Sequence, residues 1–132
     1  MALVISEISA QVSGGYFLSL PDAGYTVVSF SGELDLSDRD RIVEALRALT
    51  TVDAPLVDLS NVSYLDSTVL GALIGLNKAV ASRGKRLSVV VGSDRVLKIF
   101  SMTKLNQVFD VYESAEAAMH KNVHGIKPHR AS

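Results

Sequence analysis

Residues 56–76 read LVDLSNVSYLDSTVLGALIGL, and this stretch decides the fold class. It begins within a short apolar run, Pro55–Leu59, that is typical of a buried strand. A turn is expected over Asn61–Thr68, and apolar residues then recur at helical spacing over about Thr68–Arg83, where Gly84 supplies the stop. The helix is apolar over most of its circumference, so we expect it to be sandwiched between other elements.

The flanking sequence continues this alternation of strands and helices. Ser37-x-x-Asp40 has the character of a capping box and predicts the start of an amphipathic helix that runs to Leu49. The other expected helices cover Asp94–Met102 and Ser114–Met119, and the other expected strands are Leu3–Ile8, Tyr16–Leu20, Tyr25–Ser31, Leu87–Val91 and Val108–Tyr112. Such alternation predicts an α/β fold with a mainly parallel sheet, because parallel strands are joined by crossover helices.

The composition limits the class of protein. The chain has 132 residues, of which 48% are hydrophobic and 20% charged, which suits one globular domain with a single core. It has no cysteine, and this excludes disulfides and thiol catalysis. No apolar run approaches the ~20 residues of a membrane span and no signal-peptide pattern is seen, so we expect a cytoplasmic protein without membrane association.

The charge is unevenly distributed along the chain. Residues 1–66 carry ten acids and three bases, a net charge of −7, whereas residues 67–132 carry four acids and ten bases, a net charge of +6. The bases are scattered rather than clustered, which favours a solvated surface over a nucleic-acid site. The acidic half ends at Asp66, and it predicts an acidic docking edge there.

Asp66-Ser67-Thr68 stands where the predicted helix begins, and it has two interpretations. The simpler one is a helix N-cap, because all three residue types accept hydrogen bonds from the unpaired N–H groups of a first turn. The other is a phosphoacceptor site, since those N–H groups and the helix dipole favour a phosphate. A phosphate would make an already acidic surface more negative without unfolding the domain.

Several motifs together resemble the STAS domain family, and within it the bacterial anti-sigma factor antagonists. They are Gly32-Glu33-Leu34-Asp35 after a hydrophobic strand, Val57–Val62, and Tyr64-Leu65-Asp66-Ser67-Thr68-Val69-Leu70-Gly71, with Leu87–Val91 and Val96–Phe100 extending the match. The resemblance implies a mixed, mostly parallel sheet of four to five strands packed against about four helices. It places the domain at residues 16–121, between an N-terminal extension (1–15) and a flexible basic tail (122–132).

The resemblance also implies a function. Ser67 would be phosphorylated by an anti-sigma factor that is also a serine kinase, with Thr68 as the secondary acceptor. Unphosphorylated protein would bind this kinase and release the sigma factor, and a phosphatase would reverse the modification. Glu33, Asp35, Asp66, Ser67, Thr68 and Val69 would form the partner-binding site, on a monomer or weak dimer that needs no cofactor.

One residue departs from the family pattern. Many members have glycine where this chain has Val69, and valine does not adopt a positive φ without strain. Valine is acceptable there if the helix has already started at Thr68. We therefore expect the switch to survive, with an effect on kinase specificity left open.

Other functions find less support in the residues. A hydrolase is disfavoured because the G-x-S-x-G elbow is absent, and nucleotide binding because no Walker A or G-x-G-x-x-G pattern occurs. His120, His124 and His129 have spacings that suit a metal only on a helix, which Gly125 and Pro128 oppose. The remaining alternative is a STAS scaffold or adaptor in a stress-sensing or lipid-transport complex, without sigma control.

Overall fold

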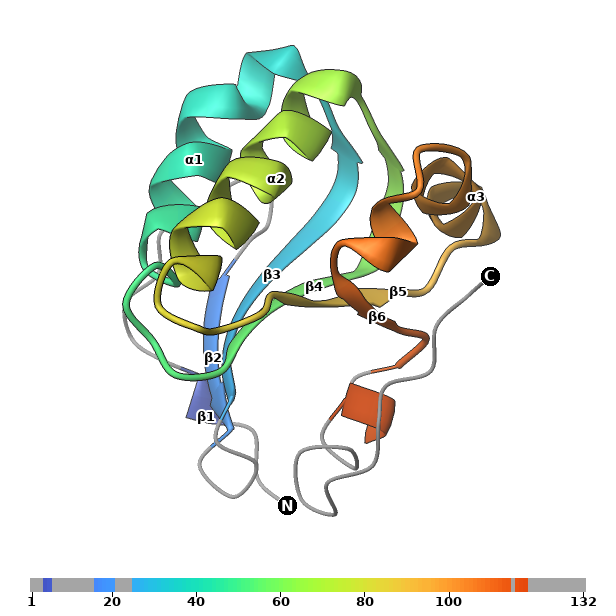
Figure 1. The fold of residues 1–132 in the computed structure, drawn as a ribbon. Coiled ribbons are helices and arrows are strands. Elements are labelled where there is room, and N and C mark those ends of the chain that lie inside the picture. The colour runs from blue at the N-terminus through green and yellow to red at the C-terminus, as the bar shows by residue number, and fades with distance from the viewer. Residues whose placement is uncertain (1–3, 6–15, 21–24, 115, 119–132) are drawn as a thin grey trace.

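The computed structural model of the protein describes residues 4–5, 16–20, 25–114 and 116–118. Within these residues, three strands come first, and three α-helices then alternate with three further strands, with two 3-10 turns, η1 and η2 (Figure 1). Their bounds are β1 Val4–Ile5, β2 Tyr16–Leu20, β3 Tyr25–Leu34, η1 Leu36–Asp38, α1 Arg39–Arg47, β4 Pro55–Leu65, α2 Ser67–Ala81, β5 Ser88–Val91, α3 Asp94–Met102, η2 Leu105–Gln107 and β6 Asp110–Tyr112.

The strands form one sheet in the order β1-β2-β3-β4-β5-β6. The first three pair antiparallel, and β3 to β6 pair parallel. This confirms the expected α/β class with a mixed, mostly parallel sheet, in which β1 and β2 extend the four parallel strands. The expected basic tail lies outside the described residues, and residues 116–118 represent the last expected helix.

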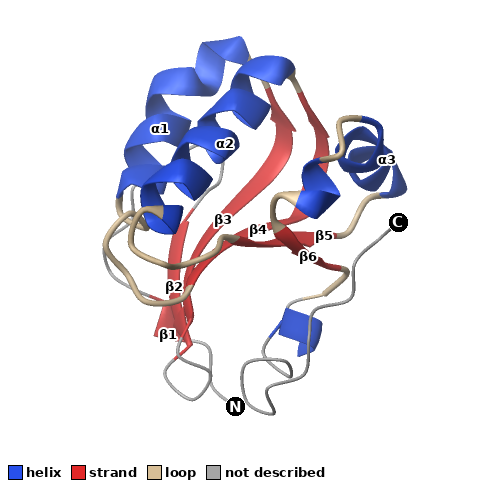
Figure 2. Ribbon diagram, viewed as in Figure 1, coloured by secondary structure: helices blue, strands red, loops and turns tan. Residues whose placement is uncertain are grey.

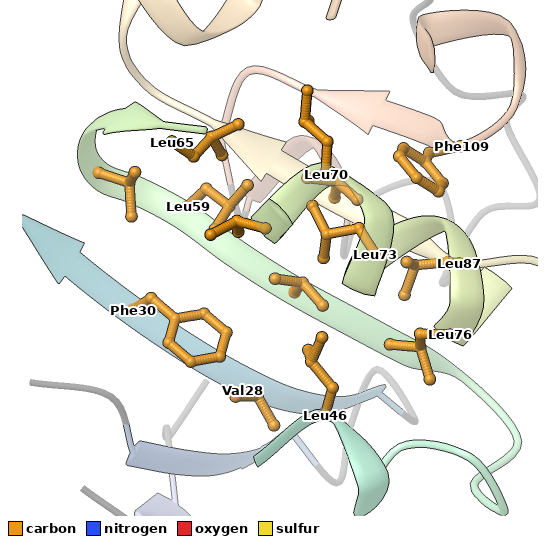
Figure 3. Close-up of a cluster of buried hydrophobic side chains, with 14 of the residues drawn as sticks. Val28, Phe30, Leu46, Leu59, Leu65, Leu70, Leu73, Leu76, Leu87 and Phe109 are labelled. Atoms are coloured by element: carbon orange, nitrogen blue, oxygen red, sulfur yellow. The ribbon is translucent and has the colours of Figure 1, made fainter. Parts of the chain in front are cut away.

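Helices α1, α2 and α3 cover one face of the sheet (Figure 2). Alternate residues of the central strands point toward them, so that Phe30, Leu59 and Val89 are buried against Leu46 of α1 and Leu73 of α2 in one apolar core (Figure 3). Burial of this kind stabilises a fold by about 25 cal/mol per Å² of apolar surface. The helical layer is therefore held to the sheet mainly by these side chains.

The opposite face of the sheet has a second, smaller core. Its buried members are Tyr25, Val27, Leu56, Val90, Tyr112 and Ala118, the last from residues 116–118. Burial raises the pKa of both Tyr25 and Tyr112, because removal from water disfavours the phenolate. Both tyrosines therefore stay neutral at physiological pH.

Strand β4 is longer than the sequence pattern predicts. Residues 61–65 were expected in a turn, but they continue the strand and pair with residues 31–34 of β3. The register shifts twice along this pair, and at each shift β4 contains one extra residue. Gly32 lies at the second shift with φ +86°, which explains a glycine at the start of the Gly32–Asp35 motif.

Two expectations about the helices are corrected. The predicted cap at Ser37 is wrong, because the capping box is Asp35 with Asp38, and it opens η1 before α1 begins at Arg39. Helix α2 is not sandwiched, since Gly71 and Gly75 of its outer side are exposed. Leu70, Ala72 and Ile74 suggested the sandwich, but they pack in or against the main core, and the outer side carries glycines that leave the helix surface open. The predicted bounds of α3 are confirmed, as is the stop at Gly84, which has φ +76°.

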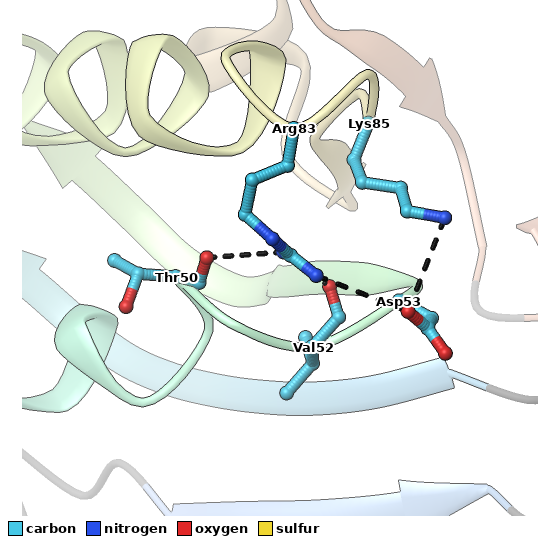
Figure 4. Close-up of polar contacts among 5 residues, drawn as sticks. All are labelled: Thr50, Val52, Asp53, Arg83 and Lys85. Atoms are coloured by element: carbon cyan, nitrogen blue, oxygen red, sulfur yellow. Dashed lines mark hydrogen bonds and ion pairs between the residues drawn. The ribbon is translucent and has the colours of Figure 1, made fainter.

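A polar cluster ties the end of α2 to the segment that enters β4 (Figure 4). Arg83 donates from its guanidinium to the carbonyl oxygens of Thr50, at 3.1 Å, and Val52, at 3.0 Å. Asp53 lies 3.9 Å from both Arg83 and Lys85. The carbonyl contacts are hydrogen bonds from a charged donor, whereas the two ion pairs are long and partly solvated.

We expect Arg83→Met to lower the free energy of unfolding by about 1 kcal/mol, because two carbonyl groups lose a charged donor. Lys85→Met is the matched control, since among the described residues the Lys85 ammonium makes only the exposed ion pair, and its loss should change stability by less than ~0.5 kcal/mol. Urea denaturation followed by circular dichroism measures both. Equal losses in the two variants would show that the ion pairs, not the carbonyl contacts, carry the stabilisation.

Candidate functional site

The junction between β4 and α2 holds the residues that the sequence singled out. Asp66 is the N-cap of α2, with extended backbone, and its Oδ1 accepts a hydrogen bond from the Val69 N–H at 3.1 Å. Ser67 is then the first residue of the helix. The N-cap interpretation of this motif is therefore confirmed for Asp66, and the two hydroxyl residues remain available for another role.

Ser67 and Thr68 differ in accessibility. The Ser67 side chain is exposed, whereas Thr68 is half-buried. Among the described residues, neither backbone N–H of this pair has a hydrogen-bond partner, as expected for the first turn of a helix. Ser67 thus combines an accessible hydroxyl with two free donors and the positive end of a helix dipole, which together suit a phosphate.

Val69 is buried in the core, whereas the resemblance places it in the partner-binding site. Its side chain is 2% exposed and belongs to the main core, so it cannot itself contact a partner. In the described part of the chain only Lys104, among residues other than glycine, has a positive φ, so Val69 is not strained. This fits the expectation that valine is tolerated once the helix has started. The Val69 side chain packs in the main core, and its backbone N–H donates the hydrogen bond that the Asp66 carboxylate accepts.

The end of β3 lies beside this turn. The Leu34 carbonyl oxygen accepts a hydrogen bond from the Asp66 N–H at 3.2 Å, and Leu34 pairs with Leu65 in the sheet register. Figure 1 shows the ends of β3 and β4 together, with α1 and α2 starting from the same end of the sheet. Two motifs about 30 residues apart in the sequence are thereby brought to one edge. Glu33 and Asp35 both have exposed side chains there.

Asp35 already has a local structural role. Its Oδ1 accepts hydrogen bonds from the Ser37 hydroxyl at 2.6 Å and the Ser37 N–H at 2.9 Å. These bonds lower the pKa of the Asp35 carboxyl group, because they favour its charged form. The group therefore remains an anion at neutral pH, and this cap interaction weakens only as the pH falls into the acidic range.

Sequence reasoning missed two exposed features near this edge. Leu36, in the η1 turn, keeps 64% of its surface exposed although it is a large apolar residue. The Arg95 guanidinium of α3 lies 5.3 Å from the centre of the Tyr64 ring at the end of β4. No signal in the sequence marks either feature, because Leu36 matches the apolar pattern of a core residue and Tyr64 was expected in a turn.

Several charged residues of α1 and α2 lie where they complement the helix dipoles. Asp35, Asp38 and Asp66 lie at or before the N-termini of α1 and α2, while Arg47 and Lys78 lie in the last turns of these helices. This arrangement complements both helix dipoles. The edge that contains Ser67 thus carries Glu33, Asp35, Asp38 and Asp66, beside the base Arg39 at the start of α1.

Within the described ranges, no three histidine, cysteine or acidic side chains gather in a way that could hold a metal ion. His120, His124 and His129 lie outside those ranges. Of the helices that the structure describes, none is both long and apolar enough to span a bilayer.

Two substitutions distinguish the hydrogen bond of the Asp66 side chain from the effect of its negative charge on stability. We expect Asp66→Ala to lower the free energy of unfolding by about 1 kcal/mol, because the Val69 N–H loses its acceptor. Asp66→Asn keeps an acceptor in the same place and should retain most of the stability. Thermal unfolding of the two variants measures this difference. An Asn variant as unstable as the Ala variant would mean that the negative charge, rather than the cap, stabilises the turn.

Comparison with known proteins adds to this geometry. The family model of the STAS domain matches residues 19–118. The chain is 36% identical over 92 residues to an anti-sigma-B factor antagonist of Staphylococcus aureus, an alignment that covers 67% of this chain and 84% of that protein. It is 29% identical over 103 residues to an anti-sigma-B factor antagonist of Listeria monocytogenes, which covers 76% of this chain and 90% of that protein.

The fold is also similar to that of solved anti-sigma factor antagonists. A solved anti-sigma factor antagonist from Mycobacterium paratuberculosis superposes with a TM-score of 0.73 at 24% identity, and covers 80% of this chain and 90% of that one. At this identity the likeness speaks for the fold alone. The family model, however, spans most of the chain and includes the ends of β3 and β4 and the start of α2. The protein belongs to the STAS domain family.

Proposed function

We propose that the protein is an anti-sigma factor antagonist that binds an anti-sigma factor kinase while Ser67 is unmodified, and that phosphorylation of Ser67 ends this binding. The observation that carries the proposal is the exposed Ser67 hydroxyl at the first position of α2. The similarity to anti-sigma-B factor antagonists supports it. Release of the sigma factor would then activate transcription indirectly.

A phosphate on Ser67 is compatible with the folded domain. The side chain is exposed, so that a phosphate can be added without displacing core residues. The free N–H groups of Ser67 and Thr68 and the dipole of the 15-residue helix α2 stabilise the added charge. Asp66 keeps its acceptor bond to Val69 in either state. The modification therefore changes the surface rather than the fold.

The same phosphate would oppose partner binding. It adds close to two negative charges to an edge that already carries Glu33, Asp35 and Asp66. A partner surface that accommodates a neutral hydroxyl would have to desolvate this charge, at a cost of several kcal/mol if it stays unpaired. About 2.7 kcal/mol already changes an affinity a hundredfold. No large conformational change is needed for the switch.

The proposed roles follow from these positions. Glu33, Asp35, Ser67 and Thr68 would contact the kinase, Asp66 would hold the acceptor turn, and a phosphatase would restore the binding form. We assign the function to residues 16–121, which contain the family match. The protein itself would be a regulator without catalytic activity, and its partners would be proteins rather than nucleic acid.

Incubation with purified anti-sigma factor kinases and Mg-ATP tests the acceptor. We expect the intact mass to increase by one phosphate in the unaltered protein and in Thr68→Val, and no increase in Ser67→Ala. Thr68→Val is the matched control because it removes the neighbouring hydroxyl and keeps the shape. Phosphate on Thr68 alone would overturn the assignment of Ser67. If no kinase phosphorylated the protein and none bound it tightly, the result would favour a STAS scaffold or adaptor instead.

The electrostatic mechanism makes a separate prediction about affinity. Ser67→Asp should weaken binding to the anti-sigma factor at least tenfold, whereas Ser67→Ala should change it by less than about threefold, because only the first introduces a charge to be desolvated. Isothermal titration calorimetry measures both affinities, with the kinase that phosphorylates Ser67 in the incubation assay as the partner. Similar affinities for the two variants would contradict the electrostatic account.

A further inference from the structure

A groove runs between α1 and α2 on the outer side of the helical layer, away from the sheet. It is lined by Val43, Leu46, Arg47 and Thr50 from α1 and the segment after it, and by Ala72, Gly75, Leu76 and Ala79 from α2. The groove exists because α2 has small residues at Ala72, Gly75 and Ala79, where larger side chains would fill the space between the helices. Its volume is about 280 Å³.

The lining is apolar apart from two residues. The Thr50 hydroxyl is used locally, because it donates to the Arg47 carbonyl oxygen at 2.7 Å. The Arg47 side chain is exposed, and among the described residues its guanidinium has no hydrogen-bond or ion-pair partner. The groove therefore offers a short apolar surface, and the Arg47 guanidinium at its α1 end has no partner in the part of the chain that the structure describes. This pattern fits a ligand with an apolar body and a single anionic group.

Size narrows the ligand further. The lining residues of α2, from Ala72 to Ala79, span a helical rise of about 10 Å, which is about two turns. The volume of about 280 Å³ lies just below the range of drug-sized sites. A groove of this length is too short to receive a partner helix along its axis. It is also poor in hydrogen-bond donors, which disfavours sugars and nucleotides.

We propose that this groove binds a medium-chain aliphatic carboxylate. The chain would lie on Leu46 and Leu76, and the carboxylate would pair with Arg47. Arg47 lies in the last turn of α1, and its exposed guanidinium supplies the positive charge. The proposal does not rest on the phosphorylation of Ser67, which lies at the opposite end of α2.

Calorimetric titration of the full chain with octanoate, decanoate and dodecanoate, each below its micelle concentration, tests the class of ligand. Each methylene that enters the groove should strengthen binding about fourfold, until the groove is full. Decanol has the same tail without the charge, and it should bind about tenfold more weakly than decanoate. Amide chemical-shift changes should map to α1 and α2.

Three variants locate the site. Gly75→Leu should abolish binding of both probes because its side chain fills the groove, and it should remain folded since a Cβ at this position meets no heavy atom within 4 Å. Arg47→Gln should weaken decanoate about tenfold and leave decanol unchanged. Lys78→Gln is the matched control, because it removes an exposed cation of α2 that does not line the groove, and it should change decanoate binding by less than about twofold.

Two results would overturn the proposal. One is the absence of saturable carboxylate binding in the unaltered protein, and the other is binding that persists unchanged in Gly75→Leu. If the first result came with a loss of anti-sigma factor binding in Gly75→Leu, the groove would be identified as a protein contact instead. The phosphorylation assay depends on Ser67 and not on the groove, so the absence of carboxylate binding would not contradict the proposed function.

Discussion

The parallel pairing of β3 with β4 is the constraint on which the rest of the structure depends. It continues for the whole length of β4 and ends with the Asp66 N–H bonded to the Leu34 carbonyl oxygen. Because both strands are held in register to their last residues, the segments that follow them start side by side. Helices α1 and α2 then return across the same face, and their apolar sides form the main core with the sheet.

This pairing also explains why one turn can serve structure and regulation together. Asp66 satisfies one orphan N–H of α2 through its side chain, and the sheet orients its own N–H. Ser67 is left with an exposed hydroxyl at a helix N-terminus, which is where a phosphate is tolerated best. The helix cap is thus a precondition for the proposed switch rather than a competing explanation of the motif.

Much of the fold could be predicted from the sequence because its signals are local. Asp94–Met102 and the stop at Gly84 were predicted correctly from capping and periodicity. The errors came where a distant partner decides the outcome. Residues 61–65 start at the polar pair Ser60-Asn61, which favours a turn, and their short alternation becomes a strand because β3 pairs with them. The cap at Asp35 likewise depends on where β3 ends.

The sequence by itself determined the α/β class, the order of the elements and the position of the hydroxyl pair at a helix start, since propensity, periodicity and capping act over a few residues. Only the tertiary structure decided which side chains are accessible. Packing buries Val69, exposes Ser67 and Leu36, and leaves a groove beside Gly75. The physical reason is that the burial of a side chain depends on which other residues pack against it, and these residues are mostly distant in the sequence.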